Sequence, residues 1–414
     1  MRLSALVRLG LAAVVMSLSG CDVSTPSHPD PQTVQPNATD GHASIAPDAR
    51  LASRATAQVS TLFSSLHAVD VHMRMLTARS GLLWGYQGSR FVMYETADGG
   101  HTWKPVHLPT LPPDDIASYG PGGSHAITAV IDSSTMWSLV CVSGGEARVW
   151  ITKDAGQSWR ERDLPLPKGT VQVAAGQWMA GRLGWLLFES GGYGGVAAKY
   201  LYRTENGGNS WQLVATSLGD LPHNGTRTVM AFAPNGKTGV MAVVDDVEEK
   251  LDVVETNDGG AHWQATSVDL PSGISQPPVV ELADAGPGES LELAVLVQIG
   301  ATSQLAVMNA TFGSSWDVSV MGVDHLVAMC ASPSGDLAAL ENKSGQMTWM
   351  LSPDGGQTWY SRAAAGLPSS VASAVSVSLT SPSPSAFFLV ALDAHLAPTL
   401  YASLDAGDAW QPLS

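Results

Sequence analysis

The hydrophobic pattern of this chain repeats about every fifty residues. Each repeat holds short apolar segments that are separated by Gly, Asp, Asn and Ser. Segments this short, bounded by turn residues, predict β-strands rather than helices. The clearest repeat divides into four such pieces, Ile127 to Ile131, Met136 to Val142, Ala147 to Thr152 and Ser158 to Asp163.

The third strand of every repeat is apolar at two consecutive positions, which lie ten and nine residues before a tryptophan. Consecutive side chains of a strand point to opposite faces, so we expect this strand to be covered on both sides, as in stacked sheets. The earlier position holds Met93, Val149, Leu201, Val253, Ala306, Trp349 and Leu400. The later position holds Tyr94, Trp150, Tyr202, Val254, Val307, Met350 and Tyr401.

A loop of eight residues joins the third and fourth strands of each repeat. It carries Ser or Thr seven residues before Trp, Asp or Asn five before, and Gly three before. Six copies keep this pattern, Thr96–Trp103, Thr152–Trp159, Thr204–Trp211, Thr256–Trp263, Ser352–Trp359 and Ser403–Trp410. The seventh, Asn309–Trp316, keeps Gly, Ser and Trp and lacks the acidic residue.

The motif is typical of a hairpin turn. A carboxylate or amide oxygen accepts backbone N–H groups inside a tight loop, Gly permits positive φ, and Trp fixes the loop by its apolar area. We therefore assign no chemistry to Asp98, Asp154, Asn206, Asp258, Asp354 and Asp405. The matching structural tryptophans are Trp103, Trp159, Trp211, Trp263, Trp316, Trp359 and Trp410.

The spacing of these tryptophans predicts the architecture. They are 56, 52, 52, 53, 43 and 51 residues apart, a period that fits one four-stranded blade. We expect residues 60–414 to form an all-β, seven-bladed β-propeller of four-stranded antiparallel blades. Each blade would come from one continuous segment, so packing of the first blade against the last would close the ring.

Residues 1–21 are typical of a bacterial lipoprotein signal. Arg2 and Arg8 supply positive charge, Leu9 to Leu18 form an apolar run too short for a membrane span, and Leu18-Ser-Gly-Cys21 resembles a lipobox. Residues 22–59, rich in Pro, Ser, Thr, Asp and Ala, predict a flexible tether. We expect an extracytoplasmic protein that is lipid-anchored to the cell membrane through Cys21.

The composition and net charge limit the classes of partner that the protein is expected to bind. The net charge is −16, and it becomes −18 once Arg2 and Arg8 are removed, which disfavours binding to nucleic acid or to anionic lipid. Cys141 and Cys330 lie in apolar strand-like segments without metal-ligand spacing, which favours two separate buried thiols. We expect no cofactor, no metal site and a monomer.

The eight-residue motif resembles the Asp-box, or bacterial neuraminidase repeat, of sialidases, xyloglucanases, sortilin-type receptors and the photosystem II assembly and stability factor family. The chain is most similar to the last of these, in Leu201–Trp211 and in the pairs Gly184-Trp185 and Trp84-Gly85. This resemblance implies a propeller whose boxes lie at its periphery. It leaves the activity open, because enzymes, receptors and assembly factors share the motif.

A functional site is expected on the face opposite these loops. We interpret the polar residues expected there as a solvated acidic rim. They are Asp114, Asp115, Tyr119, Glu146, Arg148, Glu189, Tyr193, His223, Arg227, Asp245, Glu341 and His395. The preferred hypothesis is a binding or scaffold propeller that presents this face to a protein or polysaccharide partner. The resemblance suggests that it aids assembly or stability of a membrane protein complex.

The alternative is a glycoside hydrolase of the xyloglucanase type, with Asp114 or Asp115 paired with Glu189 or Asp245. A sialidase needs three arginines that hold the carboxylate of its substrate. In this sequence only Arg362 follows Arg227, and no Arg-Ile-Pro signature occurs, which disfavours a sialidase.

Overall fold

The computed structural model describes residues 71–413, except for 88–89, 112–126, 134, 144–145, 180, 191–195, 226, 234, 246–249, 267, 269–279, 284–289, 300–301, 312–315 and 396. The described residues form strands and one short 3₁₀-helix, η2 (Ser369–Ser373). The expected signal, tether and Cys21 lie outside the described residues. Within the described part of the chain, no helix has the length and apolar character to cross a membrane.

The strands pair into seven four-stranded antiparallel sheets, each made from four strands that are consecutive in the chain. Sheets 1 to 4 are β1 (Val71–Met75) to β4 (Lys104–Pro105), β5 (Ile127–Ile131) to β8 (Arg160–Pro165), β9 (Thr170–Met179) to β12 (Gln212–Thr216), and β13 (Arg227–Phe232) to β16 (Gln264–Thr266). Sheets 5 to 7 are β17 (Val280–Ala283) to β20 (Asp317–Val323), β21 (Leu326–Ala331) to β24 (Tyr360–Ala363), and β25 (Ser376–Ser383) to β28 (Gln411–Pro412).

Between these first and last strands lie the second and third strands of each sheet. They are β2 (Gly81–Gln87), β3 (Arg90–Thr96), β6 (Trp137–Ser143), β7 (Glu146–Thr152), β10 (Leu183–Ser190), β11 (Lys199–Thr204), β14 (Gly239–Asp245) and β15 (Lys250–Thr256) in sheets 1 to 4. In sheets 5 to 7 they are β18 (Ser290–Ile299), β19 (Thr302–Thr311), β22 (Leu337–Lys343), β23 (Gln346–Ser352), β26 (Ala386–Leu392) and β27 (Pro398–Ser403).

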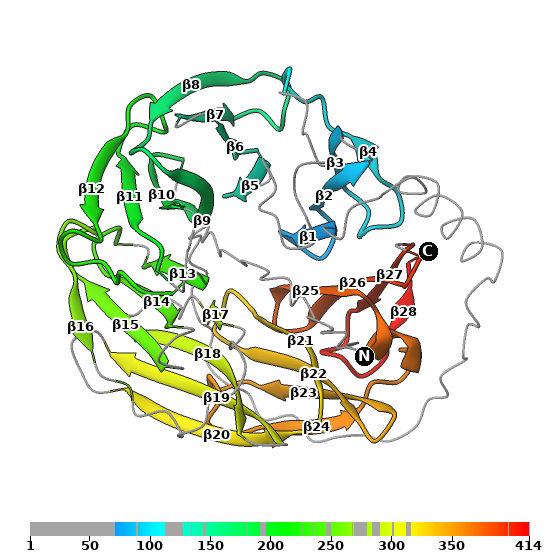
Figure 1. Cartoon of the computed structure of the whole chain (residues 1–414). Coiled ribbons are helices and arrows are strands. Elements are labelled where there is room, and N and C mark those ends of the chain that lie inside the picture. Colours follow the sequence, from blue (N-terminus) through cyan, green and yellow to red (C-terminus); the bar gives the residue numbers. More distant parts are fainter. Residues whose placement is uncertain are drawn as a thin grey trace, which may run out of the picture.

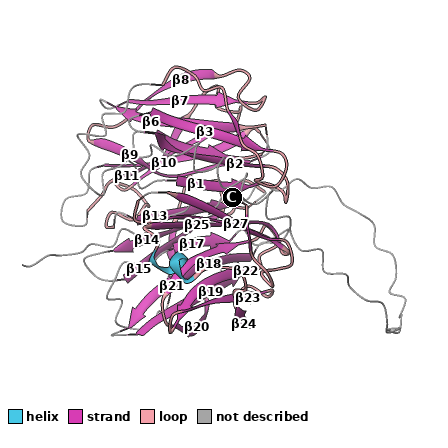
Figure 2. Ribbon diagram, turned by 90° about the vertical axis from the view of Figure 1, so that its right-hand side faces the viewer, coloured by secondary structure: helices cyan, strands magenta, loops and turns pink. Residues whose placement is uncertain are grey.

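The sheets surround a common centre, with the first strand of each sheet innermost (Figure 1). Turned by 90°, the ring shows the strands of successive sheets lying in layers (Figure 2). The expectation of an all-β propeller with four-stranded antiparallel blades is therefore confirmed.

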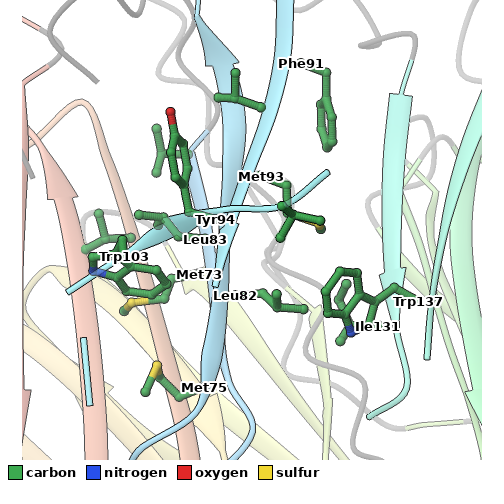
Figure 3. Close-up of a cluster of buried hydrophobic side chains, with 14 of the residues drawn as sticks. Met73, Met75, Leu82, Leu83, Phe91, Met93, Tyr94, Trp103, Ile131 and Trp137 are labelled. Carbon is green, nitrogen blue, oxygen red and sulfur yellow. The ribbon is translucent and has the colours of Figure 1, made fainter. Parts of the chain in front are cut away.

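Apolar packing joins sheet 7 to sheet 1. One buried cluster combines Met73, Leu83 and Trp103 of sheet 1 with Phe388 and Leu413 of sheet 7. The same cluster continues to Ile131 and Trp137 of sheet 2, which face Leu82 and Met93 in Figure 3. Each sheet is built from its own segment, and side-chain packing closes the ring, as the repeat pattern predicts.

The third strand of each sheet is covered on both faces. Every one of the fourteen side chains that the sequence places at the two apolar positions is buried, from Met93 and Tyr94 in β3 to Leu400 and Tyr401 in β27. Cys141 in β6 and Cys330 in β21 are two separate buried thiols, as predicted.

Polar side chains also connect neighbouring sheets. The buried Gln177 of β9 accepts a hydrogen bond from the Phe232 N–H (2.7 Å) and donates one to the Phe232 carbonyl (3.0 Å) in β13 of the next sheet. Its amide thus satisfies two backbone groups that have no strand partner on this side.

The change Gln177→Leu is expected to lower the free energy of unfolding by about 2 kcal/mol, because it leaves two buried backbone groups without a partner. Urea denaturation followed by tryptophan fluorescence measures the change. The matched control is Gln212→Leu on the exposed face of β12, for which we expect about 0.5 kcal/mol or less. Equal losses for the two variants would contradict the bridging role.

Candidate functional site

The ring has two faces that differ in their loops. The first-to-second and third-to-fourth strand loops meet on one face, which we call the Trp-loop face. There a backbone N–H of the tryptophan loop donates to the other loop of its own sheet, as in Gly99 to Arg79 (2.8 Å) and Gly259 to Lys237 (2.8 Å). The hairpins between second and third strands, such as β10–β11, lie on the opposite face.

All six loops that keep the full motif share one hydrogen-bond pattern. In the first, the Thr96 hydroxyl accepts the Gly100 N–H (2.9 Å) and donates to Asp98 Oδ1 (2.9 Å), which also accepts the Thr102 N–H (2.9 Å). The same three bonds recur around Asp154, Asn206, Asp258, Asp354 and Asp405. The Oδ1 atom of each Asp or Asn is thus occupied within its own loop.

These bonds make the loops sensitive to acid. Burial acts to raise the pKa of Asp258, but hydrogen bonds from His262, Thr256 and Ala261 together lower it to about 2. The same kind of bonding lowers the pKa of Asp98, Asp154, Asp354 and Asp405. A carboxylate whose pKa is depressed in the folded state contributes stability above its unfolded pKa and loses it as the pH falls through the folded value.

We therefore expect the urea midpoint to fall between about pH 4 and pH 2, and to fall less steeply in Asp258→Asn than in the wild type. The loop of sheet 3 supplies the matched control. Asn206 already makes the three bonds with an amide, so Asn206→Asp should steepen the same fall. Identical pH profiles for all three proteins would exclude this source of acid sensitivity.

The opposite face carries the candidate site residues. Asp114, Asp115, Tyr119 and Tyr193 lie outside the described residues. Glu189 lies near the end of β10, beside the β10–β11 hairpin of sheet 3, and Asp245 lies at the end of β14, beside the β14–β15 hairpin of sheet 4. Both side chains have 0% exposure. Glu341 is 3% exposed and accepts the Asp324 N–H (3.2 Å). The interpretation as a solvated rim is wrong for these three carboxylates, whereas Glu146, His223 and His395 are exposed.

Glu189 belongs to a buried polar cluster between sheets 3 and 4. One carboxylate oxygen accepts the Thr228 hydroxyl of β13 (2.5 Å), and the other accepts the Gln172 side-chain amide of β9 (3.1 Å). The Lys199 ammonium, paired with Glu189 across the β10–β11 hairpin, lies 3.9 Å from it. The carboxylate therefore has partners on both sides of the sheet junction.

The Lys199 ammonium is held mainly by backbone oxygens. It donates to the carbonyls of Gly225 (2.9 Å), Asn224 (3.2 Å) and Ala197 (3.2 Å) and is fully buried. Gly225 has a φ of +82°, and a Cβ there would meet the Val244 carbonyl oxygen at 2.1 Å, so only glycine allows this approach. The Asn224 amide then donates to Asp245 (3.0 Å), which brings Asp245 into the same cluster.

Burial shifts both charged groups toward neutrality. It raises the pKa of Glu189 against the opposing effects of Lys199, Thr228 and Gln172. It lowers the pKa of Lys199 against the attraction of Glu189, Asp252 and Asp245. A buried pair of this kind needs every remaining hydrogen bond to be made, and here those bonds are present.

The cluster joins two sheets and offers no open catalytic position. The structure does bring Glu189 and Asp245 together through Lys199 and Asn224, but both carboxylates are enclosed and hydrogen-bonded within the protein. No group of three or more His, Cys, Asp or Glu within the described residues is arranged to hold a metal ion.

Sequence reasoning missed Lys199, Thr228, Gln172 and Asn224. None of these residues stands in a motif, and their distances along the chain, such as 39 residues from Glu189 to Thr228, do not suggest a contact. The pairing of sheets 3 and 4 is what brings them together.

No protein-family model and no curated protein matches the sequence. Among solved structures, the chain is similar to prolyl oligopeptidase B from Galerina marginata in complex with a macrocyclization substrate (TM-score 0.51, 9% identity, covering 88% of this chain and 52% of that one). It is also similar to a GH74 enzyme from Niastella koreensis (TM-score 0.49, 13% identity, 83% and 54% covered). A Hadza microbial sialidase is a further match (TM-score 0.45, 14% identity, 81% and 65% covered).

The chain spans less than two thirds of the length of each of these proteins. At 9% identity, the likeness to the prolyl oligopeptidase concerns the fold alone.

Proposed function

We propose that the chain is a lipid-anchored, extracytoplasmic Asp-box propeller of seven blades that binds a protein or polysaccharide partner through the face opposite its tryptophan loops. The observation that carries this proposal is the enclosure of Glu189 and Asp245. Both have 0% exposure and both are hydrogen-bonded within the protein, so neither is placed to reach a substrate. The same bonds make the junction of sheets 3 and 4 a rigid support for a binding face.

Exposed apolar side chains on this face favour binding. Leu218, 93% exposed, and Val196, 39% exposed, flank the ends of β12 and β11 in sheet 3. Backbone hydrogen bonds connect these segments, since the Ser217 N–H donates to the Lys199 carbonyl (3.0 Å). Val196 also forms an isolated antiparallel β-bridge with Asn224. Among the described residues, Leu218 is the most exposed large apolar side chain, which makes it the first candidate for a partner contact.

The test uses photo-crosslinking of the full chain in its native membrane. A crosslinker at position 218 should capture one partner in stoichiometric amount, and the matched crosslinker at the exposed Asn235 on the Trp-loop face should not. Capture of a membrane protein complex would fit the assembly-factor resemblance. Equal capture at both positions, or none at position 218, would contradict a partner on the opposite face.

The lipid anchor is tested separately. After cell fractionation, we expect the wild-type chain in the membrane fraction and the Cys21→Ser variant in the soluble fraction.

A glycoside hydrolase remains the alternative, with Asp114 or Asp115 acting beside Glu189 or Asp245. It requires hydrolysis of a glucan or an aryl-glycoside that is abolished by Asp114→Asn or Asp115→Asn. We expect no such activity. Hydrolysis that depends on either aspartate would replace the binding proposal.

A further inference from the structure

The outermost strand of sheet 5 has an open edge. β20 lies at the rim of the ring and is the last strand in the order β17-β18-β19-β20 (Figure 1). Within the described part of the chain it pairs with β19 alone, in a continuous register from Asp317 to Val323. Alternate residues of such a strand direct their backbone N–H and C=O groups away from the sheet, where a further strand can bind them.

The outermost strands of the other sheets carry features that protect an edge from pairing. β4, β16 and β28 have only two or three residues each. β8 carries four charged side chains and ends in Pro165, β24 carries Arg362, and a bulge interrupts the pairing of β12. Short length, charge, proline and bulges all prevent edge-to-edge association. β20 is the longest of these outermost strands, and its one charged residue, Asp317, stands at its start.

The side chains of β20 leave room for a second strand. Val320, at the middle of the strand, is 43% exposed. A Cβ placed at Gly322 would meet nothing within 4 Å, so the space beside this residue is open. Met321 and Val323 instead pack into an apolar cluster with side chains of sheet 6, which holds the strand in place.

We propose that β20 pairs antiparallel with β20 of a second copy of this chain, around a two-fold axis at Val320. This register uses the whole strand and places Val320 opposite Val320 of the second copy. Val318 then lies opposite Gly322, where the open space accepts its side chain, and Asp317 lies opposite Val323, so no like charges meet. Facing β-branched side chains stabilise a strand pair.

The occupant is a second copy because β20 is complementary to itself in this register. An incoming strand must have an unprotected edge of its own, and among the described outermost strands β20 has one. A two-fold contact of this kind also closes on itself and leaves no free edge for further growth. The proposal differs from the monomer expected from the sequence. It is independent of the proposed function, because β20 lies on the rim and leaves the opposite face free.

The contact is small and nearly uncharged. Pairing of one strand buries less area than a standard interface, so we expect a dissociation constant on the order of 10–100 μM. The net charge of −16 repels two copies at long range. Raising the salt to about 0.5 M screens that repulsion and should strengthen the dimer, whereas an association through ion pairs would weaken.

The first test maps the register with cysteines in the unlipidated chain that begins at Asp22, whose own Cys141 and Cys330 are buried. In Val320→Cys the two new thiols face each other. Opposite Cα atoms of an antiparallel pair lie about 4.5–5.5 Å apart, which a disulfide allows. Mild oxidation at a protein concentration above the dissociation constant should therefore give a covalent dimer. Val318→Cys should link to Gly322→Cys in a mixture but not to itself.

The second test uses charge and sedimentation equilibrium. Val320→Lys places two ammonium groups opposite each other and should weaken the dimer about tenfold. An equimolar mixture of Val320→Lys and Val320→Glu should restore association, which a folding defect in either variant would not allow. The matched control is Leu213→Lys on β12, which changes a side chain of 40% exposure and should dimerise as the wild type does.

Four results would each overturn the proposal. They are a wild-type chain that stays monomeric well above the expected dissociation constant, Leu213→Cys that crosslinks as readily as Val320→Cys, a mixture of the Lys and Glu variants that stays monomeric, and capture of a different protein by Val320→Cys in the native membrane. The last result would assign the edge to another chain.

Discussion

Lys199→Met is expected to lower the free energy of unfolding by about 3–5 kcal/mol, because it leaves the Glu189 carboxylate buried without its cation. Glu189 and Lys199 both have 0% exposure, and three backbone carbonyls would lose their donor as well. Urea denaturation at neutral pH, followed by tryptophan fluorescence, gives the value.

Two further variants identify the cause. Lys199→Met combined with Glu189→Gln should recover part of the loss, since it removes the unpaired charge. Lys168→Met, on an exposed lysine, should cost about 0.5 kcal/mol or less. A Lys199→Met protein as stable as the wild type would show that the cluster does not hold sheets 3 and 4 together.

Trp185→Ala is expected to cost about 3–5 kcal/mol, the range for truncating a large buried aromatic side chain. Trp185 of β10 has 0% exposure and stacks on Phe232 of the next sheet, with ring centroids 4.0 Å apart and planes at 10°. Its indole N–H also donates to the Gly259 carbonyl in the tryptophan loop of sheet 4 (3.0 Å). The same denaturation experiment measures the loss.

Trp185→Phe separates the stacking from the hydrogen bond. It keeps an aromatic ring against Phe232 and loses the indole donor, so we expect a cost of about 1–2 kcal/mol. Should Trp185→Ala cost no more than Trp185→Phe, the stacked ring would contribute little and the junction would depend on polar contacts.

The sequence predicts much of this fold because the repeats are short and local. Each of the six loops that keep the full motif closes with bonds between residues two to four positions apart, as when the Thr102 N–H donates to Asp98. The eight-residue pattern is therefore enough to specify these loops. The two consecutive apolar positions of the third strands likewise indicate burial on both faces of the strand. The structure confirms this burial for all fourteen side chains, from Met93 to Tyr401.

The candidate site could not be predicted in the same way. Glu189 stands at the end of a hairpin, where a carboxylate is usually exposed, and only the contact with Thr228 and Lys199 explains why it is buried. Likewise, Gln177 and Phe232 are 55 residues apart, and no local preference connects them. Contacts between sheets depend on the angle and the offset between neighbouring blades, and these cannot be read from a single sequence.

The junction of sheets 1 and 7 has a consequence for how the ring opens. Among the described residues, no strand is shared between these two sheets. Leu413 beside Gly100 and the surrounding apolar side chains hold the ends of the fold together without exchanging backbone partners. A ring with this seam could separate along one line while every sheet keeps its internal ladder. It could also gain or lose a whole repeat during evolution, because no hairpin would be cut in two.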